Sequence, residues 1–116
     1  MDDAERALTD LTEISSQIEA AVLLDASGAL VASTGANGER VAEAARALLA
    51  AAAEARGGER ALTQLEVATL DGSVFVVREG DRAIAATTGP EPTVGLVFYD
   101  LKSALRAAAA GDDGGA

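Results

Sequence analysis

The sequence predicts a single α+β domain in which a mainly antiparallel sheet lies between helices. Segments with helical spacing occur at the start, middle and end of the chain, and runs with a period of two lie between them. The turn dipeptides Asp71-Gly72 and Gly80-Asp81 separate three of these runs, as tight hairpins require. A length of 116 residues fits one domain. We expect that domain to span residues 1–110, followed by a flexible, acidic, glycine-rich tail at 111–116.

The first element is predicted to be a helix from Asp2 to about Glu19. The acids Asp2 and Asp3 at its start suit the positive end of a helix dipole. Apolar residues recur every three or four positions, as on one helical face: Ala4, Ala7, Leu8, Leu11, Ile14 and Ile18. A hairpin should follow, with strands at Ala20–Asp25 and Ala29–Thr34 around the turn Ala26-Ser27-Gly28.

The middle element is predicted to be an alanine-rich helix from Glu39 to Arg56. Asn37 is expected to be its N-cap. The pair Gly57-Gly58 can supply the backbone conformation of a C-cap.

Three strands should follow, beginning with the long run Ala61–Leu70. If both turns are two-residue loops, Thr69 faces Val74, Val67 faces Val76, Val77 faces Ile84 and Glu79 faces Arg82. One face would carry Leu65, Val67, Val74, Val76 and Ala85, and the other Phe75, Val77, Ile84 and Ala86. Both faces are apolar, so helices should cover both. The last helix is predicted to open at Pro92 or Thr93 and to run to about Ala110.

The composition excludes several kinds of function. The chain has no Cys and no His, which excludes disulfides, cysteine–zinc sites and a Ser/His/Asp triad. We find no catalytic constellation, nucleotide fingerprint or cofactor motif, so the prediction is a protein that is not an enzyme and has no cofactor or metal. A net charge of −10 argues against nucleic acid and anionic membranes. It serves either solubility or attraction to a basic partner. Without an apolar span or signal peptide, the protein is expected to be cytoplasmic.

The middle helix has an apolar stripe of unusually small side chains. Its members are Val41, Ala44, Ala45, Leu48, Leu49, Ala52 and Ala55. Such residues allow close helix packing, which favours an interface with a second copy of the chain. The alternative is that alanine is present for its helix propensity alone.

The strand Ala61–Leu70 favours the same interface. It ends a three-strand meander, so it can be a sheet edge, and a long edge is a liability unless it is paired. Pairing with its twin would place Leu62, Gln64, Glu66 and Ala68 at the interface and bring the two alanine helices together.

Three strings of the sequence resemble the roadblock (dynein light-chain) family, in its small bacterial and archaeal single-domain form. They are "AAVLLDASGALVAST", "LTQLEVATLDGSVFVVREG" and "RAIAATTGPEPTVGLVFYDLKSAL". The resemblance implies a profilin-like, five-stranded antiparallel sheet with one helix on one face and two on the other. It also implies a homodimer formed through the third strand and middle helix, and a role as scaffold or activator of a small Ras-like GTPase.

Arg40, Arg46 and Arg56 are the candidate partner-contact residues on the middle helix. Because the chain has few such arginines, scaffolding ranks above activation. The alternatives are a small-ligand sensor, which would need a cavity of roughly 300 Å³ or more with convergent polar groups, and a purely structural dimerisation module.

Overall fold

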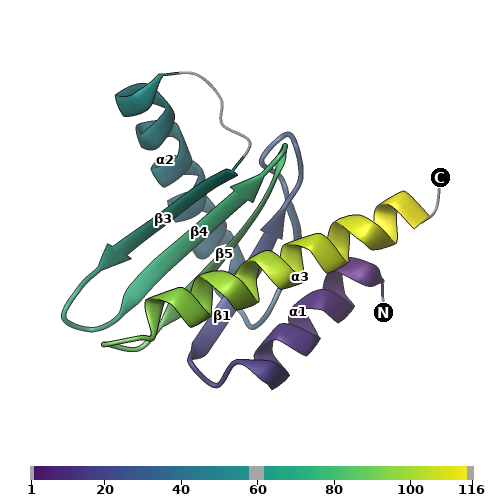
Figure 1. The fold of residues 1–116 in the computed structure, drawn as a ribbon, viewed down its shortest axis with the longest axis horizontal. Coiled ribbons are helices and arrows are strands. Elements are labelled where there is room, and N and C mark those ends of the chain that lie inside the picture. The colour runs from purple at the N-terminus through teal and green to yellow at the C-terminus, as the bar shows by residue number, and fades with distance from the viewer. Residues whose placement is uncertain (1, 58–61, 115–116) are drawn as a thin grey trace.

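The chain folds into a five-stranded antiparallel sheet with helices on both faces (Figure 1). The computed structural model describes residues 2–57 and 62–114. The elements are α1 (Asp3–Ile14), β1 (Ile18–Leu24), β2 (Leu30–Ser33), α2 (Gly38–Arg56), β3 (Leu62–Ala68), β4 (Ser73–Glu79), β5 (Arg82–Thr88) and α3 (Val94–Gly114). This order and the antiparallel sheet confirm the predicted fold class. The strand order is β2-β1-β5-β4-β3, so β3 is an edge strand, as predicted.

Helices α1 and α3 lie side by side on one face of the sheet, and α2 covers the other (Figure 1). The first face packs Phe75 and Ile84 against Leu8, Val97 and Leu101. Phe75 is fully buried and meets Phe98 of α3 edge to face, with ring centroids 5.1 Å apart. Such burial of an aromatic ring is a large contribution to the core.

The second face carries a separate cluster beneath α2. Val22, Val76 and Ala85 of the sheet pack against Val41 and Ala45 of the helix. The alternation of β4 and β5 therefore divides their side chains between the two cores, as the period of two predicts. Val67 of β3 lies on the predicted face, the one covered by α2, and is 40% exposed at the sheet edge.

The first helix is shorter than the predicted 2–19. It ends at Ile14, where the amide of Ser15 donates to the carbonyl of Leu11. Ile18 begins β1, pairs with Thr88 and is buried in the core as a strand residue. Ile18 continues the helical spacing by coincidence, which is why the boundary was misplaced. The Asp2 carboxylate caps the helix by accepting from the amide of Glu5 at 2.8 Å.

The β3–β4 turn is longer than the predicted two-residue loop. Val67, and not Thr69, faces Val74, so the register differs by two residues while each side chain keeps its face. The Thr69 hydroxyl accepts from the amides of Asp71 and Gly72 and donates to the Gly72 carbonyl. These bonds satisfy the backbone of a four-residue turn, which the Asp-Gly rule does not anticipate. The β4–β5 register is as predicted, with Val77 opposite Ile84 and Glu79 opposite Arg82.

The remaining differences concern element ends. The first hairpin pairs Ile18–Leu24 with Leu30–Ser33, in place of Ala20–Asp25 with Ala29–Thr34. The third strand ends at Ala68 and not at Leu70, while Ala61 and Gly58 lie outside the described residues.

The ends of α2 and α3 also differ in detail from the prediction. Asn37 occupies the N-cap position of α2 but makes no capping hydrogen bond, because its backbone is not extended. Gly57 ends α2 with a φ of 68°, a conformation that glycine adopts without strain, as the predicted glycine C-cap requires. Helix α3 begins at Val94 and continues to Gly114, past the predicted end at Ala110. That the tail at 111–116 is flexible stays a prediction.

Candidate functional site

Helix α2 presents one side to its own sheet and the other to solvent. Val41 and Ala45, predicted at a dimer interface, are buried against the protomer's own strands. Ala44, Leu48 and Leu49 are half-buried, and so is Ala52, whereas Ala55 is exposed. The apolar stripe is wide because its centre packs on the sheet and only its borders remain for a partner. The period of 3.6 identified the stripe and could not tell its centre from its borders.

Strand β3 presents different side chains on its two faces. Its even-numbered residues pair with Val77 and Phe75 across β4 and share the face that carries α1 and α3. All four of them are exposed: Leu62, Gln64, Glu66 and Ala68. They therefore lie on the sheet face opposite α2, although Leu62 and Gln64 also line a groove that they share with Leu49 and Ala52 of α2. The α2 side of β3 carries Thr63, Leu65 and Val67, and the interface prediction did not include them. The period of two places these residues on the same sheet face as Val76, which could have indicated that they lie beside α2.

A groove of about 290 Å³ separates the C-terminal half of α2 from β3. Its helix side is lined by Leu49, Ala52, Ala53 and Arg56, and its strand side by Leu62, Thr63, Gln64 and Leu65. Arg78 of β4 lies in the groove as well. Within residues 2–57 and 62–114, β3 has a strand neighbour on one side only. An unpaired backbone edge thus runs beside a groove with both apolar and polar lining, an arrangement suited to pairing with another chain.

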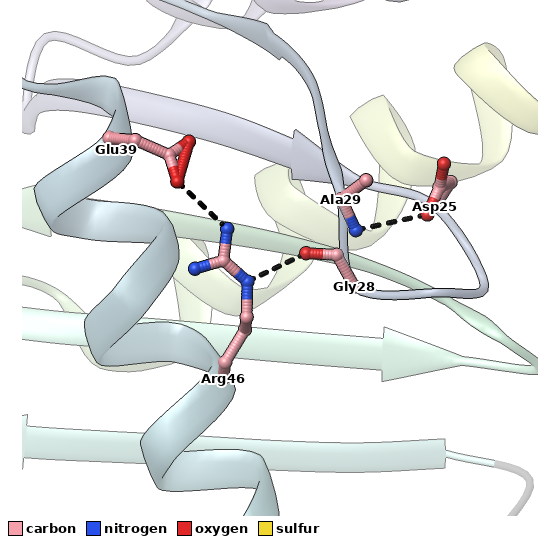
Figure 2. A network of polar contacts seen from close by, with 5 residues as sticks. All are labelled: Asp25, Gly28, Ala29, Glu39 and Arg46. Atoms are coloured by element: carbon pink, nitrogen blue, oxygen red, sulfur yellow. Dashed lines mark hydrogen bonds and ion pairs between the residues drawn. The ribbon is translucent and has the colours of Figure 1, made fainter.

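The three predicted partner arginines have different surroundings. Arg46 is held by its own chain: its Nε donates to the carbonyl of Gly28 at 2.7 Å, and one terminal nitrogen lies 3.0 Å from the Glu39 carboxylate (Figure 2). It thereby ties α2 to the β1–β2 turn. Arg40 and Arg56 are exposed on α2.

The β1–β2 turn that Arg46 contacts is organised by a carboxylate. Asp25 accepts from the amide and hydroxyl of Ser27. It also accepts from the amide of Ala29 (Figure 2). The hydrogen bond from the Ser27 hydroxyl, followed by that from the Ala29 amide, lowers the pKa of Asp25 below its ordinary value. The carboxylate is therefore ionised at neutral pH, and its Oδ1 accepts all three of these hydrogen bonds.

A second ion pair links the sheet to α3. Arg106 donates two hydrogen bonds to Glu79, at 2.8 and 2.7 Å. These bonds lower the pKa of Glu79 and raise the pKa of Arg106. The pair is bidentate, which fixes its geometry, and it lies on the surface, where solvent weakens it.

A cavity that the sequence analysis did not predict lies between two turns and α2. Its volume is about 670 Å³, and it lies between the β1–β2 turn, the middle of α2 and the β4–β5 turn. Arg46 and Arg78 both line it. Arg78 lies two residues from Val76, on the same face of a mostly apolar strand. The sequence therefore gives no indication that Arg78 lines a cavity beneath α2.

The described residues offer little for metal or membrane chemistry. No group of three or more acidic side chains within them is arranged to hold a metal ion. None of the helices in that part of the chain combines the length and hydropathy needed to cross a bilayer.

Solved structures with the same fold come from several bacteria. A Roadblock/LC7 domain from Streptomyces avermitilis superposes with a TM-score of 0.76 at 20% identity, covering 93% of this chain and 96% of that one. The gliding protein MglB of Thermus thermophilus gives a TM-score of 0.69 at 19% identity, covering 96% and 90%. MglB of Myxococcus xanthus gives 0.63 at 18% identity, covering 90% and 89%.

Sequence comparison gives the family. No curated protein matches the chain. The Roadblock/LC7 domain family, however, matches residues 6–88, which span α1 to the end of β5. The resemblance seen in the sequence is thereby confirmed, and the chain belongs to the Roadblock/LC7 domain family.

Proposed function

We propose that this chain is a non-enzymatic, cytoplasmic regulator of a small Ras-like GTPase and that it acts as a homodimer. The observation that carries the proposal is the Roadblock/LC7 match over residues 6–88. The family resemblance implies GTPase regulation as the usual work of such domains. An MglB structure of the same fold is described as having a tetrameric arrangement, so assembly of this fold has a precedent.

The unpaired edge of β3 supports the homodimer. The strand is seven residues long, and its outer backbone groups have no strand neighbour among the described residues. Thr63 and Gln64 guard this edge only weakly. Antiparallel pairing of two β3 strands would join two sheets and bring the two α2 grooves together across the axis. The half-buried borders of α2, such as Leu48 and Ala52, would then lose their remaining exposure to water.

Scaffolding is favoured over activation by the state of Arg46. Its guanidinium is engaged by Gly28 and Glu39, so reaching a nucleotide on a partner would require breaking both contacts. Arg40 and Arg56 are exposed on α2 and can contact a partner surface. The protein would then contribute binding surface and not a catalytic side chain.

Nucleotide-dependent capture tests the GTPase assignment. The immobilised protein is exposed to cytosol of its own source organism with either GDP or a non-hydrolysable GTP analogue, and retained proteins are identified by mass spectrometry. We expect a small GTPase to be retained with one nucleotide and not with the other. Retention of no protein in a nucleotide-dependent manner would contradict the assignment and leave a purely structural dimerisation module.

The small-ligand alternative has one observation in its favour. The cavity beside Arg46 and Arg78 is larger than the roughly 300 Å³ that small-molecule pockets require. A thermal shift screen with anionic metabolites distinguishes a sensor from a scaffold, because only a sensor is stabilised by free ligand.

A further inference from the structure

Helices α1 and α3 leave a groove between them on the surface that faces away from the sheet. Figure 1 shows the two helices side by side and antiparallel, so the end of α1 lies beside the first half of α3. The groove has a volume of about 190 Å³. Its floor consists of the buried Ala7, Leu11 and Ala104, while Ser103 and Ala107 lie along its α3 side. Small side chains of this kind leave room for another element to approach closely.

Large apolar side chains are exposed at one end of this groove. Ile14 is the last residue of α1, lines the groove and is 75% exposed. On α3, Leu96 lies one turn before Asp100 on the same helical stripe. Leu96 and its neighbour on the next turn, Tyr99, are both at least half exposed. Exposed apolar side chains that gather in one place mark an interaction surface.

Negative charge is concentrated at the same end of the groove. Asp10 and Glu13 lie near the C-terminal end of α1, where the helix dipole is itself negative and no base occupies the last turn. Asp100 lines the groove from the α3 side and is half-buried. It has no hydrogen bond or ion pair to any residue that the structure describes. Acids in such surroundings are unfavourable in the protein alone, and a nearby cation would relieve them.

The bases of α1 and α3 do not neutralise these acids. Arg6 pairs with Asp3 at the start of α1. Arg106 donates to Glu79 of β4, and Lys102 also lies close enough to Glu79 to lower the pKa of that carboxyl. The two helices contain no further Lys or Arg. The negative end of the groove is therefore complementary to a basic partner.

The shape of the groove suits a helix better than a small molecule or a strand. Its volume is below the roughly 300 Å³ of small-molecule pockets. Its walls are helices, whose backbone groups are bonded within each helix, so an extended peptide would find no backbone partners there. A helix satisfies its own backbone and packs its side chains between the two walls. The stretch from Ala7 to Ile14 is about 10 Å long, which matches about two turns of such a helix.

We propose that the groove between α1 and α3 binds a basic amphipathic helix of a partner protein. The apolar stripe of that helix packs on Leu11 and Ile14, and its Lys or Arg residues lie beside Asp10 and Asp100. The helices of a second copy of the chain are unsuitable occupants, because their apolar faces already pack on their own sheet. The groove lies on the sheet face opposite α2, so this site is independent of the proposed GTPase and of the dimer.

Selection from a library of helical peptides tests the groove without a known partner. Phages display peptides of about 15 residues, roughly four turns, with one helical face randomised, and the immobilised full chain selects among them. We expect the selected peptides to share apolar residues at i, i+4 and i+7 and to carry Lys or Arg at one end of this stripe. Selection of no peptide, or of peptides without the basic residues, would overturn the proposal.

Matched variants assign the binding of a selected peptide to the groove. Ile14→Ser removes an exposed apolar contact and should weaken binding by about tenfold, whereas Val31→Ser makes a similar change on β2 and should leave the affinity unchanged. Asp100→Asn should weaken binding and reduce its dependence on salt. Asp71→Asn removes the same charge from the exposed β3–β4 turn and should do neither. Equal affinity of wild type, Ile14→Ser and Asp100→Asn would refute the assignment.

Amide NMR of ¹⁵N-labelled protein distinguishes the groove from other surfaces. Titration with a selected peptide should shift the amide resonances of Ile14, Asp100 and Ser103 in a saturable manner. Shifts confined to α2 and β3 would place the peptide on the candidate dimer surface and overturn the proposal. Dilution of the protein alone should leave the groove resonances unchanged. A shift on dilution would identify a second copy of the chain as the occupant and would also overturn the proposal.

Discussion

Gly72 shows how a single position can restrict the turn between β3 and β4. Its φ of 156° lies in the region that favours glycine, and a methyl group there would collide with the carbonyl oxygen of Thr88. Gly80, in the next turn, has a φ of 67° and open space where its methyl would go. The two glycines therefore differ in sterics, although both have positive φ.

We expect Gly72→Ala to destabilise the fold more than Gly80→Ala. The Gly80 variant should lose about 1–2 kcal/mol from left-handed backbone strain alone. The Gly72 variant should lose more, because its methyl also displaces the backbone of Thr88. Urea unfolding monitored by circular dichroism measures both free energies. Equal losses would show that the Thr88 contact relaxes without cost.

Asp25 makes the stability of the β1–β2 turn depend on pH. Hydrogen bonds from Ser27 and Ala29 lower its folded-state pKa below the reference value of 3.8. Its stabilising effect is therefore complete above the unfolded-state pKa and is lost as the pH falls through the lower, folded-state pKa. Wild type should be more stable than Asp25→Ala at pH 7, and the difference should shrink in strong acid. A difference that persists undiminished when wild-type Asp25 is protonated would contradict this account.

At the scale of elements, α2 has one side packed against the sheet and the other side exposed to solvent. Ala45 has no exposed surface and packs in the cluster under the helix, whereas Ala47 faces solvent. Ala45→Glu would bury an unpaired charge and should cost about 3 kcal/mol or more. Ala47→Glu should change stability by less than about 0.5 kcal/mol. Chemical denaturation of the two variants compares them. A mild effect of Ala45→Glu would mean that α2 can lift from the sheet.

Element type was more predictable from the sequence than element ends. Periods of 3.6 and two indicated the order of helices and strands, because each element buries one face or both. The end of α1 was misplaced because Ile18 faces the core both as a continued helix and as a strand. The β3–β4 register was misplaced because the Thr69 side chain, and not the Asp-Gly pair alone, builds that turn. Interactions of this kind depend on tertiary geometry that a pattern does not contain.

At the scale of the molecule, the sequence could indicate which elements form a candidate interface but not which side chains. Edge position and a wide small-residue stripe pointed to β3 and α2. Only the packed structure shows that Val41 and Ala45 belong to the core and that Leu65 and Val67 lie on the α2 side of β3. The cavity lined by Arg46 and Arg78 was missed altogether, since it depends on how two turns and a helix come together.

The central claim is a homodimer through the β3 edge, and the mass in solution tests it most directly. Val67→Lys places a charge on β3, and Val31→Lys places the same charge on the opposite edge strand, β2. Both valines are exposed, at 40% and 48%. Lysine guards an edge against pairing.

Light scattering coupled to gel filtration at micromolar concentration gives the mass of each protein. We predict two 11.6 kDa protomers for wild type and for Val31→Lys, and a single protomer for Val67→Lys. A monomeric wild type, or a dimer that Val31→Lys dissociates and Val67→Lys does not, would contradict the claim.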